Sequence, residues 1–103
     1  MAMLPIIFAR LSKKVQEAGG VPKDAKLFYI RDARQVVGNC ALWWAVNGAG
    51  YTCELDQAGV YTYDEAFSGR RATDIPYEIE EVEKLVVRHV RLDHLRERVI
   101  DPI

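Results

Sequence analysis

The residues best suited to metal binding or nucleophilic catalysis are two cysteines and two histidines, Cys40, Cys53, His89 and His94. Zinc sites generally hold ligand pairs at short spacing, whereas twelve residues separate the two cysteines. A cysteine beside His89 would give a nucleophile and its base. Both cysteines, however, fall on the predicted core face of a hairpin, where burial makes a thiol unreactive. We therefore expect buried thiols, surface histidines, no metal and no cofactor.

The carboxylates and glycines predict no catalytic site either. Asp32 stands beside Arg34 at the end of a predicted strand, and Asp74 stands where a helix cap is expected. Acid–base catalysis by paired carboxylates needs a pocket that shifts one pKa, and no spacing in this chain indicates one. Residues 48–50 contain two glycines but precede a strand rather than the helix of a phosphate-binding loop. An enzyme is therefore the least favoured class.

A nucleic-acid surface would form if the strands carrying Arg31, Arg34, Trp43, Arg88 and Arg91 adjoined. The net charge of −1 opposes this interpretation, so we do not expect direct nucleic-acid binding. Trp43 has two further interpretations. It is a core residue covered by a helix, or it anchors a partner protein, since tryptophan is common at interface hot spots.

Charge is unevenly distributed along the 103 residues, although 14 basic and 15 acidic side chains nearly cancel. Residues 54–83 carry nine acidic and two basic side chains, and the flanking segments are net basic. An acidic surface attracts a basic protein, including one that binds nucleic acid. The residues that we expect to contact a partner are Trp43, Glu54, Asp64, Glu78, Glu80 and Glu81.

These residues must be positioned by a few short elements, of which the first is an amphipathic helix over residues 6–18. Its apolar stripe, Ile7, Leu11 and Val15, recurs at every fourth residue. Pro5 suits the first turn, and Gly19 with Gly20 ends the helix. A helix of about 13 residues is marginal alone in water. The stripe must therefore dock on the body of the domain or on a second copy, forming a homodimer.

A β-hairpin follows. Residues 27–31 predict a first strand, and a turn at 38–39 separates it from residues 40–46, which are apolar on both faces like a central strand. Asn47-Gly48 predicts a tight turn because both residues tolerate a positive φ. Tyr51–Leu55 is the expected partner strand.

The parity of this hairpin distinguishes its two tryptophans. A two-residue loop pairs Trp44 with Tyr51, whereas a four-residue loop pairs Trp44 with Cys53. Both registers put Trp44, Tyr51 and Cys53 on the core face. Trp43 then points to the opposite face, beside Thr52 with the two-residue loop or Glu54 with the four-residue loop. A three-residue loop with a bulge would break this assignment and stays open.

The second half of the chain predicts two helices. Thr62 and Glu65 match a capping box, and Gly69 ends the helix that it starts. Residues 73–76 combine a cap with a proline, which predicts a second helix running to Leu85. Residues 86–92 alternate apolar and basic side chains and fit either a last strand or a continuation of that helix.

Residues 28–95 resemble a group of small, uncharacterised proteins of bacteria and their phages. The resemblance lies in these segments: Tyr29–Asp32, Gly38-Asn39, Leu42–Trp44, Gly48–Thr52, Leu55, Ala58-Gly59, Tyr61-Thr62 and Glu65-Ala66. No activity is assigned to the group, so no site residue carries over. The resemblance implies a mobile-element protein that binds a host protein complex, for example to block a defence system, and this rests on analogy.

The sequence as a whole predicts a single α+β domain, residues 1–103, with residues 6–18 appended to a body of residues 27–103. We expect an antiparallel meander of three or four strands packed with two or three helices. The leading function is a non-catalytic protein-binding module, and the alternative is a small-molecule or nucleotide-binding domain with an aromatic pocket around Trp43, Tyr51 and Tyr61. Residues 4–9 are too short an apolar run for a signal peptide or membrane span, so a cytoplasmic protein is expected.

Overall fold

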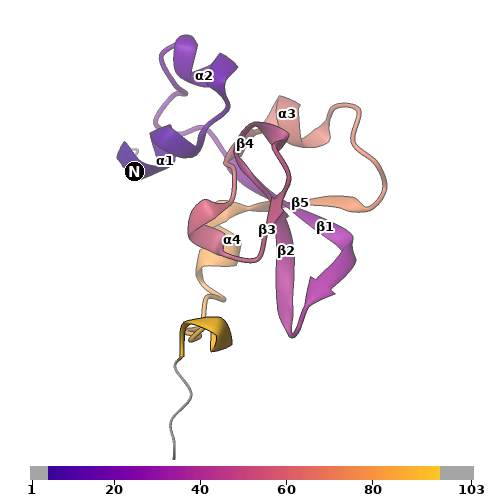
Figure 1. Ribbon diagram of the computed structural model, residues 1–103. Coiled ribbons are helices and arrows are strands. Elements are labelled where there is room, and N and C mark those ends of the chain that lie inside the picture. The colour runs from indigo at the N-terminus through magenta and orange to yellow at the C-terminus, as the bar shows by residue number, and fades with distance from the viewer. Residues whose placement is uncertain (1–4, 96–103) are drawn as a thin grey trace, which may run out of the picture.

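Strand β1 (Leu27–Val37) is the centre of a five-stranded antiparallel sheet. The computed structural model describes residues 5–95, with side chains from residue 7 onward. The predicted domain, residues 1–103, therefore extends beyond the described residues at both ends. The other elements are α1 (Pro5–Arg10), α2 (Lys13–Glu17), β2 (Cys40–Trp44), β3 (Tyr51–Thr52), β4 (Tyr61–Thr62), α3 (Tyr63–Phe67), β5 (Asp74–Glu78) and α4 (Ile79–Glu83), with 3₁₀ turns at Val46–Gly48, Leu55–Gln57 and Leu92–His94 (Figure 1).

Strand pairing places β5 on one side of β1 and the remaining strands on the other. Phe28 lies opposite Glu78 of β5 and Tyr61 of β4, and Arg31 lies opposite Ile75 of β5 and Trp43 of β2. Strand β3 pairs with the far side of β2. The predicted α+β meander is confirmed, with β5 as an additional edge strand.

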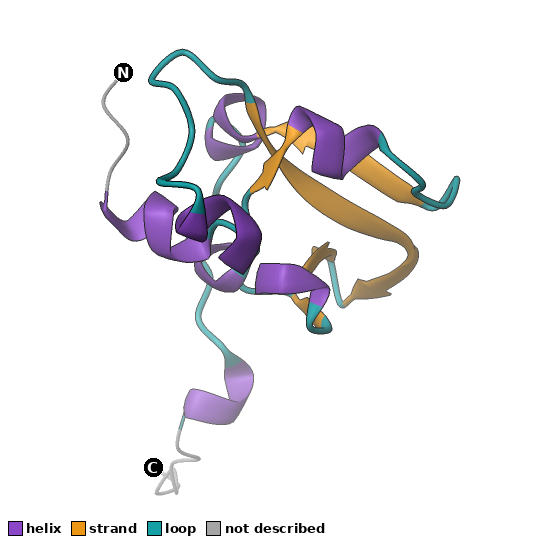
Figure 2. Cartoon of the chain, turned by 90° about the horizontal axis from the view of Figure 1, so that it is seen from above, coloured by secondary structure: helices purple, strands orange, loops and turns teal. Residues whose placement is uncertain are grey.

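The main hydrophobic core lies on one face of the sheet. Tyr29 of β1 and Trp43 of β2 point to this face, where α1, α2 and α4 cover them. Phe28 and Ile30, which alternate with Tyr29 along β1, form a smaller core on the opposite face with Ala66 of α3. Figure 2 shows α3 on the side of the sheet away from α1 and α2. The two faces are therefore unequally covered.

The N-terminal segment forms two short helices instead of the single helix predicted over residues 6–18. The chain leaves the helix at Leu11 because the Arg10 carbonyl accepts a hydrogen bond from Val60 N–H at 2.9 Å. Ser12 then caps α2 by accepting from Val15 N–H at 3.3 Å. Leu11 is fully buried in the main core, so the apolar stripe docks on the chain's own body.

The boundaries of this segment agree with the sequence. Helix α1 begins at Pro5, and α2 ends before Gly19 and Gly20, whose φ angles are +92° and +97°. Positive φ favours glycine, so these two residues end the helix as predicted. A homodimer through the stripe stays a prediction.

The hairpin turn at Asn47-Gly48 is confirmed, with φ angles of +60° and +65°. Trp44 pairs with Tyr51 and Trp43 with Thr52, which is the register that a two-residue loop predicts. The two tryptophans therefore lie on opposite faces of the sheet, as expected.

The helix-covered interpretation of Trp43 is confirmed, whereas the expected burial of Tyr51 and Cys53 on the other face was wrong. Trp43 is only 9% exposed and belongs to the main core, whereas Trp44 is half-buried and Tyr51 is 38% exposed. Cys53 is also exposed rather than buried. The reason is that three of the four helices among the described residues dock on the Trp43 face. Parity separates two faces, but the packing of distant helices decides which face is buried.

Residues 74–78 form strand β5 instead of the predicted first turns of a helix, so the helix expected from residue 76 is reduced to α4. The Thr73 carbonyl accepts a hydrogen bond from Ala33 N–H of β1. The backbone hydrogen-bonding groups of every second residue after it, residues 75 and 77, therefore also face β1. The Pro76 nitrogen then faces the free edge of the sheet, where a proline loses no ladder bond. Asp74 is buried and is not a helix cap.

The capping box at α3 is confirmed in both directions. Glu65 N–H donates to Thr62 Oγ1 at 3.3 Å, and Thr62 N–H donates to Glu65 Oε1 at 3.0 Å. Gly69 follows the helix with a φ of +66°. Beyond α4, residues 86–91 are neither strand nor helix, so both alternatives for this segment were wrong. Among residues 5–95, no helix has the length and apolar character needed to cross a bilayer.

Candidate functional site

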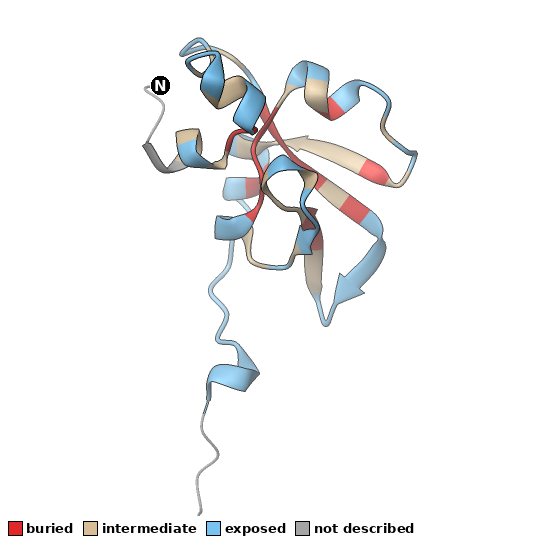
Figure 3. Cartoon of the chain, turned by 45° about the horizontal axis from the view of Figure 1, so that its top comes forward, coloured by how far each residue is buried: buried red, intermediate tan, exposed pale blue. Residues whose placement is uncertain are grey.

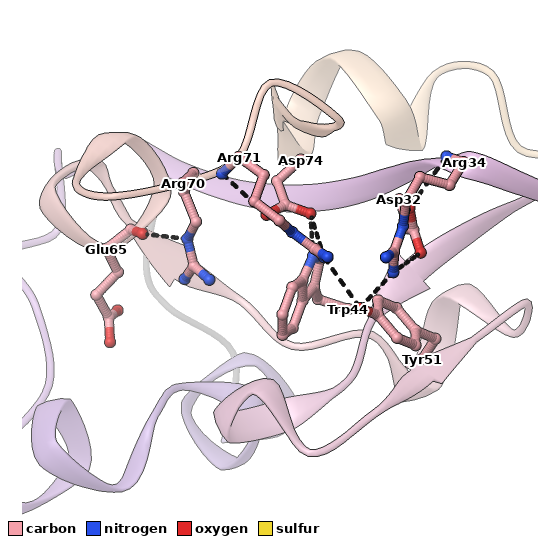
Figure 4. Close-up of polar contacts among 8 residues, drawn as sticks. All are labelled: Asp32, Arg34, Trp44, Tyr51, Glu65, Arg70, Arg71 and Asp74. Carbon is pink, nitrogen blue, oxygen red and sulfur yellow. Dashed lines mark hydrogen bonds and ion pairs between the residues drawn. The ribbon is translucent and has the colours of Figure 1, made fainter.

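The less covered face of the sheet carries a cluster of polar and aromatic side chains, which we call the arginine–aromatic face. It comprises Arg34 of β1, Trp44 of β2, Tyr51 of β3, and Arg70 and Arg71 from the loop between α3 and β5 (Figure 4). The sheet register creates this arrangement, because Trp44 and Tyr51 are paired across β2 and β3 and their rings lie 5.0 Å apart.

Arg34 is held by a carboxylate of its own strand. Asp32 is fully buried, and its two oxygens accept from Arg34 Nε and Nη2, both at 2.9 Å. Arg34 N–H also donates to Asp32 Oδ1 at 3.0 Å. These hydrogen bonds lower the pKa of Asp32 to about 2, against the opposing effect of desolvation. The bidentate pair fixes the guanidinium plane and leaves the Arg34 side chain 41% exposed.

Arg71 is held in the same way from the neighbouring strand. Burial alone would raise the pKa of Asp74, but hydrogen bonds from Arg71 and Trp44 outweigh it and lower that pKa. Arg71 Nε and Nη2 donate to the two carboxylate oxygens at 3.2 Å, and Trp44 Nε1 donates to Oδ1 at 3.1 Å. The Arg71 side chain is 48% exposed. Arg34 and Arg71 are therefore each partly exposed and each paired with a buried carboxylate.

Both arginines converge on the phenol of Tyr51. Arg34 Nη2 donates to Tyr51 Oη at 2.9 Å, and Arg71 Nη2 donates to the same oxygen at 3.2 Å. Figure 4 shows the two guanidinium groups reaching the phenol from two sides. The phenol oxygen of Tyr51 therefore lies between the guanidinium groups of Arg34 and Arg71.

Arg70 completes the face without a carboxylate partner among the described residues. Its Nε donates to the Glu65 carbonyl at 2.8 Å, and its guanidinium lies 5.3 Å from the Trp44 ring and 5.4 Å from the Tyr61 ring. Beside it is a shallow hollow of about 390 Å³ that Lys14 also lines. Tyr61 is buried, which raises its pKa, and its hydroxyl donates to the Ala45 carbonyl.

A second candidate surface is the C-terminal segment, residues 85–95, which leaves the body after α4. Six large apolar side chains of this segment are between 52% and 82% exposed: Leu85, Val86, Val87, Val90, Leu92 and Leu95. Figure 3 shows the segment exposed throughout. Arg91 connects it to the body through an ion pair with Glu54, and Arg91 also pairs with Asp93.

The acidic residues expected to bind a partner are not gathered on one surface. Asp64 lies exposed on α3, whereas Glu80 and Glu81 lie exposed on α4, on the other face of the sheet. Glu78 pairs with Lys26 at 3.4 Å, and Glu54 pairs with Arg91 as above. A cavity of about 310 Å³ beside α4 is lined by acidic and basic side chains alike. The acidic segment is therefore divided and partly neutralised.

Trp43 lies in the main core, 9% exposed and 5.7 Å from the Tyr29 ring, so little of it is open to a partner. The expected aromatic pocket is rearranged, because Tyr51 and Tyr61 lie on the face of Trp44 instead. The residues of the supposed nucleic-acid stripe are also separated. Arg31 and Trp43 are neighbours across β1 and β2, but Arg88 and Arg91 belong to the C-terminal segment.

The cysteines and histidines lie apart from one another. Cys40 is half-buried at the start of β2, and His89 and His94 are exposed in the C-terminal segment. Within residues 7–95, no three His, Cys, Asp or Glu side chains are close enough to hold a metal ion.

Sequence reasoning missed the arginine–aromatic face, although a signal was present. Arg70 and Arg71 are the only basic residues between positions 54 and 83. An adjacent arginine pair inside an acidic stretch indicates specific partners for the guanidinium groups, here Asp74 and Tyr51 for Arg71 and the Glu65 carbonyl for Arg70.

Comparisons with known proteins identified no relative. No protein-family model, no curated protein and no solved structure matches the chain.

Proposed function

We propose that this chain is a non-catalytic protein-binding module whose contact element is the C-terminal segment, residues 85–95. The observation that carries the proposal is the exposure of six large apolar side chains within eleven residues. Proteins rarely leave a contiguous apolar surface in water, and such a surface is typical of a protein-binding site. The proposal moves the expected contact from Trp43 and the acidic residues to this segment.

The chemistry of the segment specifies the partner. Arg88 and Arg91 lie among valine and leucine residues, and residues 86–91 form neither helix nor strand, with extended backbone at Arg91 before the 3₁₀ turn Leu92–His94. An extended segment binds by adding to a sheet edge, where main-chain hydrogen bonds give affinity and alternate side chains enter pockets. The partner therefore offers a sheet edge or groove with apolar pockets and a carboxylate rim.

The β5 edge of the chain's own sheet fits this role poorly. Pro76 faces outward on β5 and supplies no N–H there, which is one way that edge strands avoid pairing. A second copy joined along β5 is therefore disfavoured, and we take the partner to be a different protein. The resemblance to small phage proteins adds, by analogy, that the partner is part of a host complex.

The test is capture of a stoichiometric protein by the tagged full chain from a lysate of the source organism. A variant with Val87→Ser, Val90→Ser and Leu92→Ser removes the apolar side chains and keeps the charges. The matched control is Val36→Ser with Val37→Ser, which changes apolar residues that are 63% and 48% exposed at the β1–β2 hairpin. We expect wild type and control to retain the protein and the segment variant to lose it.

Both variants should keep the far-ultraviolet circular dichroism of the wild type, because the altered side chains are exposed. Equal capture by the segment variant and the wild type would refute the proposal. Loss of capture by the hairpin control alone would move the contact to the β1–β2 hairpin.

A further inference from the structure

The arginine–aromatic face has hydrogen-bond donors that the protein itself does not use. Arg34 and Arg71 each donate from Nε and Nη2 to a carboxylate, and from Nη2 also to Tyr51. The Nη1 group of neither arginine donates a hydrogen bond within residues 7–95. Tyr51 Oη accepts from both arginines, and its own O–H donates to no residue in that range. Arg70 likewise has both Nη groups free of hydrogen bonds to the described residues.

Two exposed cations of this face have buried counter-charges. Asp32 and Asp74, which are buried, balance Arg34 and Arg71, and the Arg70 guanidinium forms no ion pair with a described residue. Glu65 lines the same hollow as Arg70, and its carboxylate, which also accepts from Thr62, offsets the Arg70 charge without pairing with it. The donors are held in fixed positions by buried carboxylates, so little entropy is lost when an anion binds.

The same contacts exclude a ligand held mainly by ring stacking. Tyr51, Arg70 and Arg71 already lie against the Trp44 ring, at 5.0, 5.3 and 5.9 Å. What this cluster offers to solvent is N–H and O–H donors, which match a group composed of acceptors. The free Nη groups are charged donors, which suit the oxygens of a tetrahedral oxyanion.

We propose that Arg34, Arg70, Arg71 and Tyr51 form a binding site for a phosphate group. The site does not depend on the C-terminal segment, so the proposed function and this site can fail separately.

The test is isothermal titration calorimetry of the full chain with inorganic phosphate at constant ionic strength, with a chloride titration as the blank. Arg70→Gln is the main variant, because Arg70 supports no buried carboxylate and its loss should leave the fold intact. Loss of this charged donor should weaken phosphate binding about tenfold. Tyr51→Phe, which removes the phenol and keeps both arginine–aspartate pairs, should also weaken it.

Arg88→Gln is the matched control, since it removes one exposed arginine far from the face and should not change the affinity. The proposal is overturned if phosphate shows no saturable binding beyond chloride, or if Arg88→Gln weakens binding as much as Arg70→Gln. Parallel titrations with phosphoserine and adenosine monophosphate identify the source of the phosphate, because the natural class should bind more tightly than inorganic phosphate.

Discussion

Asp32 of β1 and Asp74 of β5 lie opposite one another in the sheet, and each buried carboxylate holds a different exposed arginine. Two carboxylates side by side would normally oppose each other's ionisation. Here each is hydrogen-bonded to its own guanidinium, and both have a lowered pKa. The pair therefore supports a row of cations on the surface rather than an acid–base couple.

This arrangement predicts a pH dependence of stability. A carboxylate whose pKa is about 2 in the folded chain, below its ordinary value, stabilises the fold at neutral pH and loses that contribution as the pH falls. The free energy of unfolding should therefore decrease from about pH 5 toward about pH 2. Asp32→Asn should flatten this decrease in urea titrations at several pH values. Asp64→Asn, at an exposed acid of α3, should keep the wild-type slope, and equal slopes for all three proteins would contradict the assignment.

The two tryptophans should differ in their contribution to stability. Trp43→Ala removes a buried ring from contacts with Tyr29 and Tyr77, so we expect a loss of about 3–5 kcal/mol. Trp44→Phe keeps an aromatic ring and loses the hydrogen bond to Asp74, for an expected cost of about 1–3 kcal/mol. Equilibrium unfolding in urea measures both. A larger cost at Trp44 would show that the wrong face has been called the main core.

Arg10 tests whether the N-terminal helices are integrated into the domain. Its Nε donates to the Ala58 carbonyl at 2.8 Å, and its Nη2 donates to the Leu55 carbonyl at 2.7 Å and to Tyr29 Oη at 3.1 Å. Lysine cannot reproduce this fork, so Arg10→Lys should lower the free energy of unfolding by about 1–3 kcal/mol. Lys14→Met at an exposed site should change it by less than about 0.5 kcal/mol. No loss in Arg10→Lys would mean that the Arg10 hydrogen bonds contribute little to the fold.

Features set by local backbone chemistry were predictable from the sequence. The Asn47-Gly48 turn depends on residues that tolerate a positive φ, and the capping box depends on Thr62 and Glu65 three residues apart. The opposite faces of Trp43 and Trp44 follow from strand parity alone. Each of these depends on neighbours within a few residues.

Features set by distant contacts were not predictable. The break at Leu11 needs the N–H of Val60, and β5 replaces a helix start because residues 73–78 pair with β1. A cap followed by a proline is typical of a helix, but Pro76 fits equally well on the outer edge of a sheet. The arginine–aromatic face needs Arg34 and Arg71, 37 positions apart, to meet on Tyr51.

The central claim is that residues 85–95 bind the partner protein, and competition by a synthetic peptide of residues 84–95 tests it most directly. The tagged full chain is loaded with its captured protein and then treated with excess peptide or with a scrambled peptide of the same composition. The segment does not pack into either hydrophobic core, so the peptide should reproduce its contacts. We predict that the native peptide releases the captured protein and the scrambled peptide does not. Retention of the protein at saturating native peptide would contradict the claim.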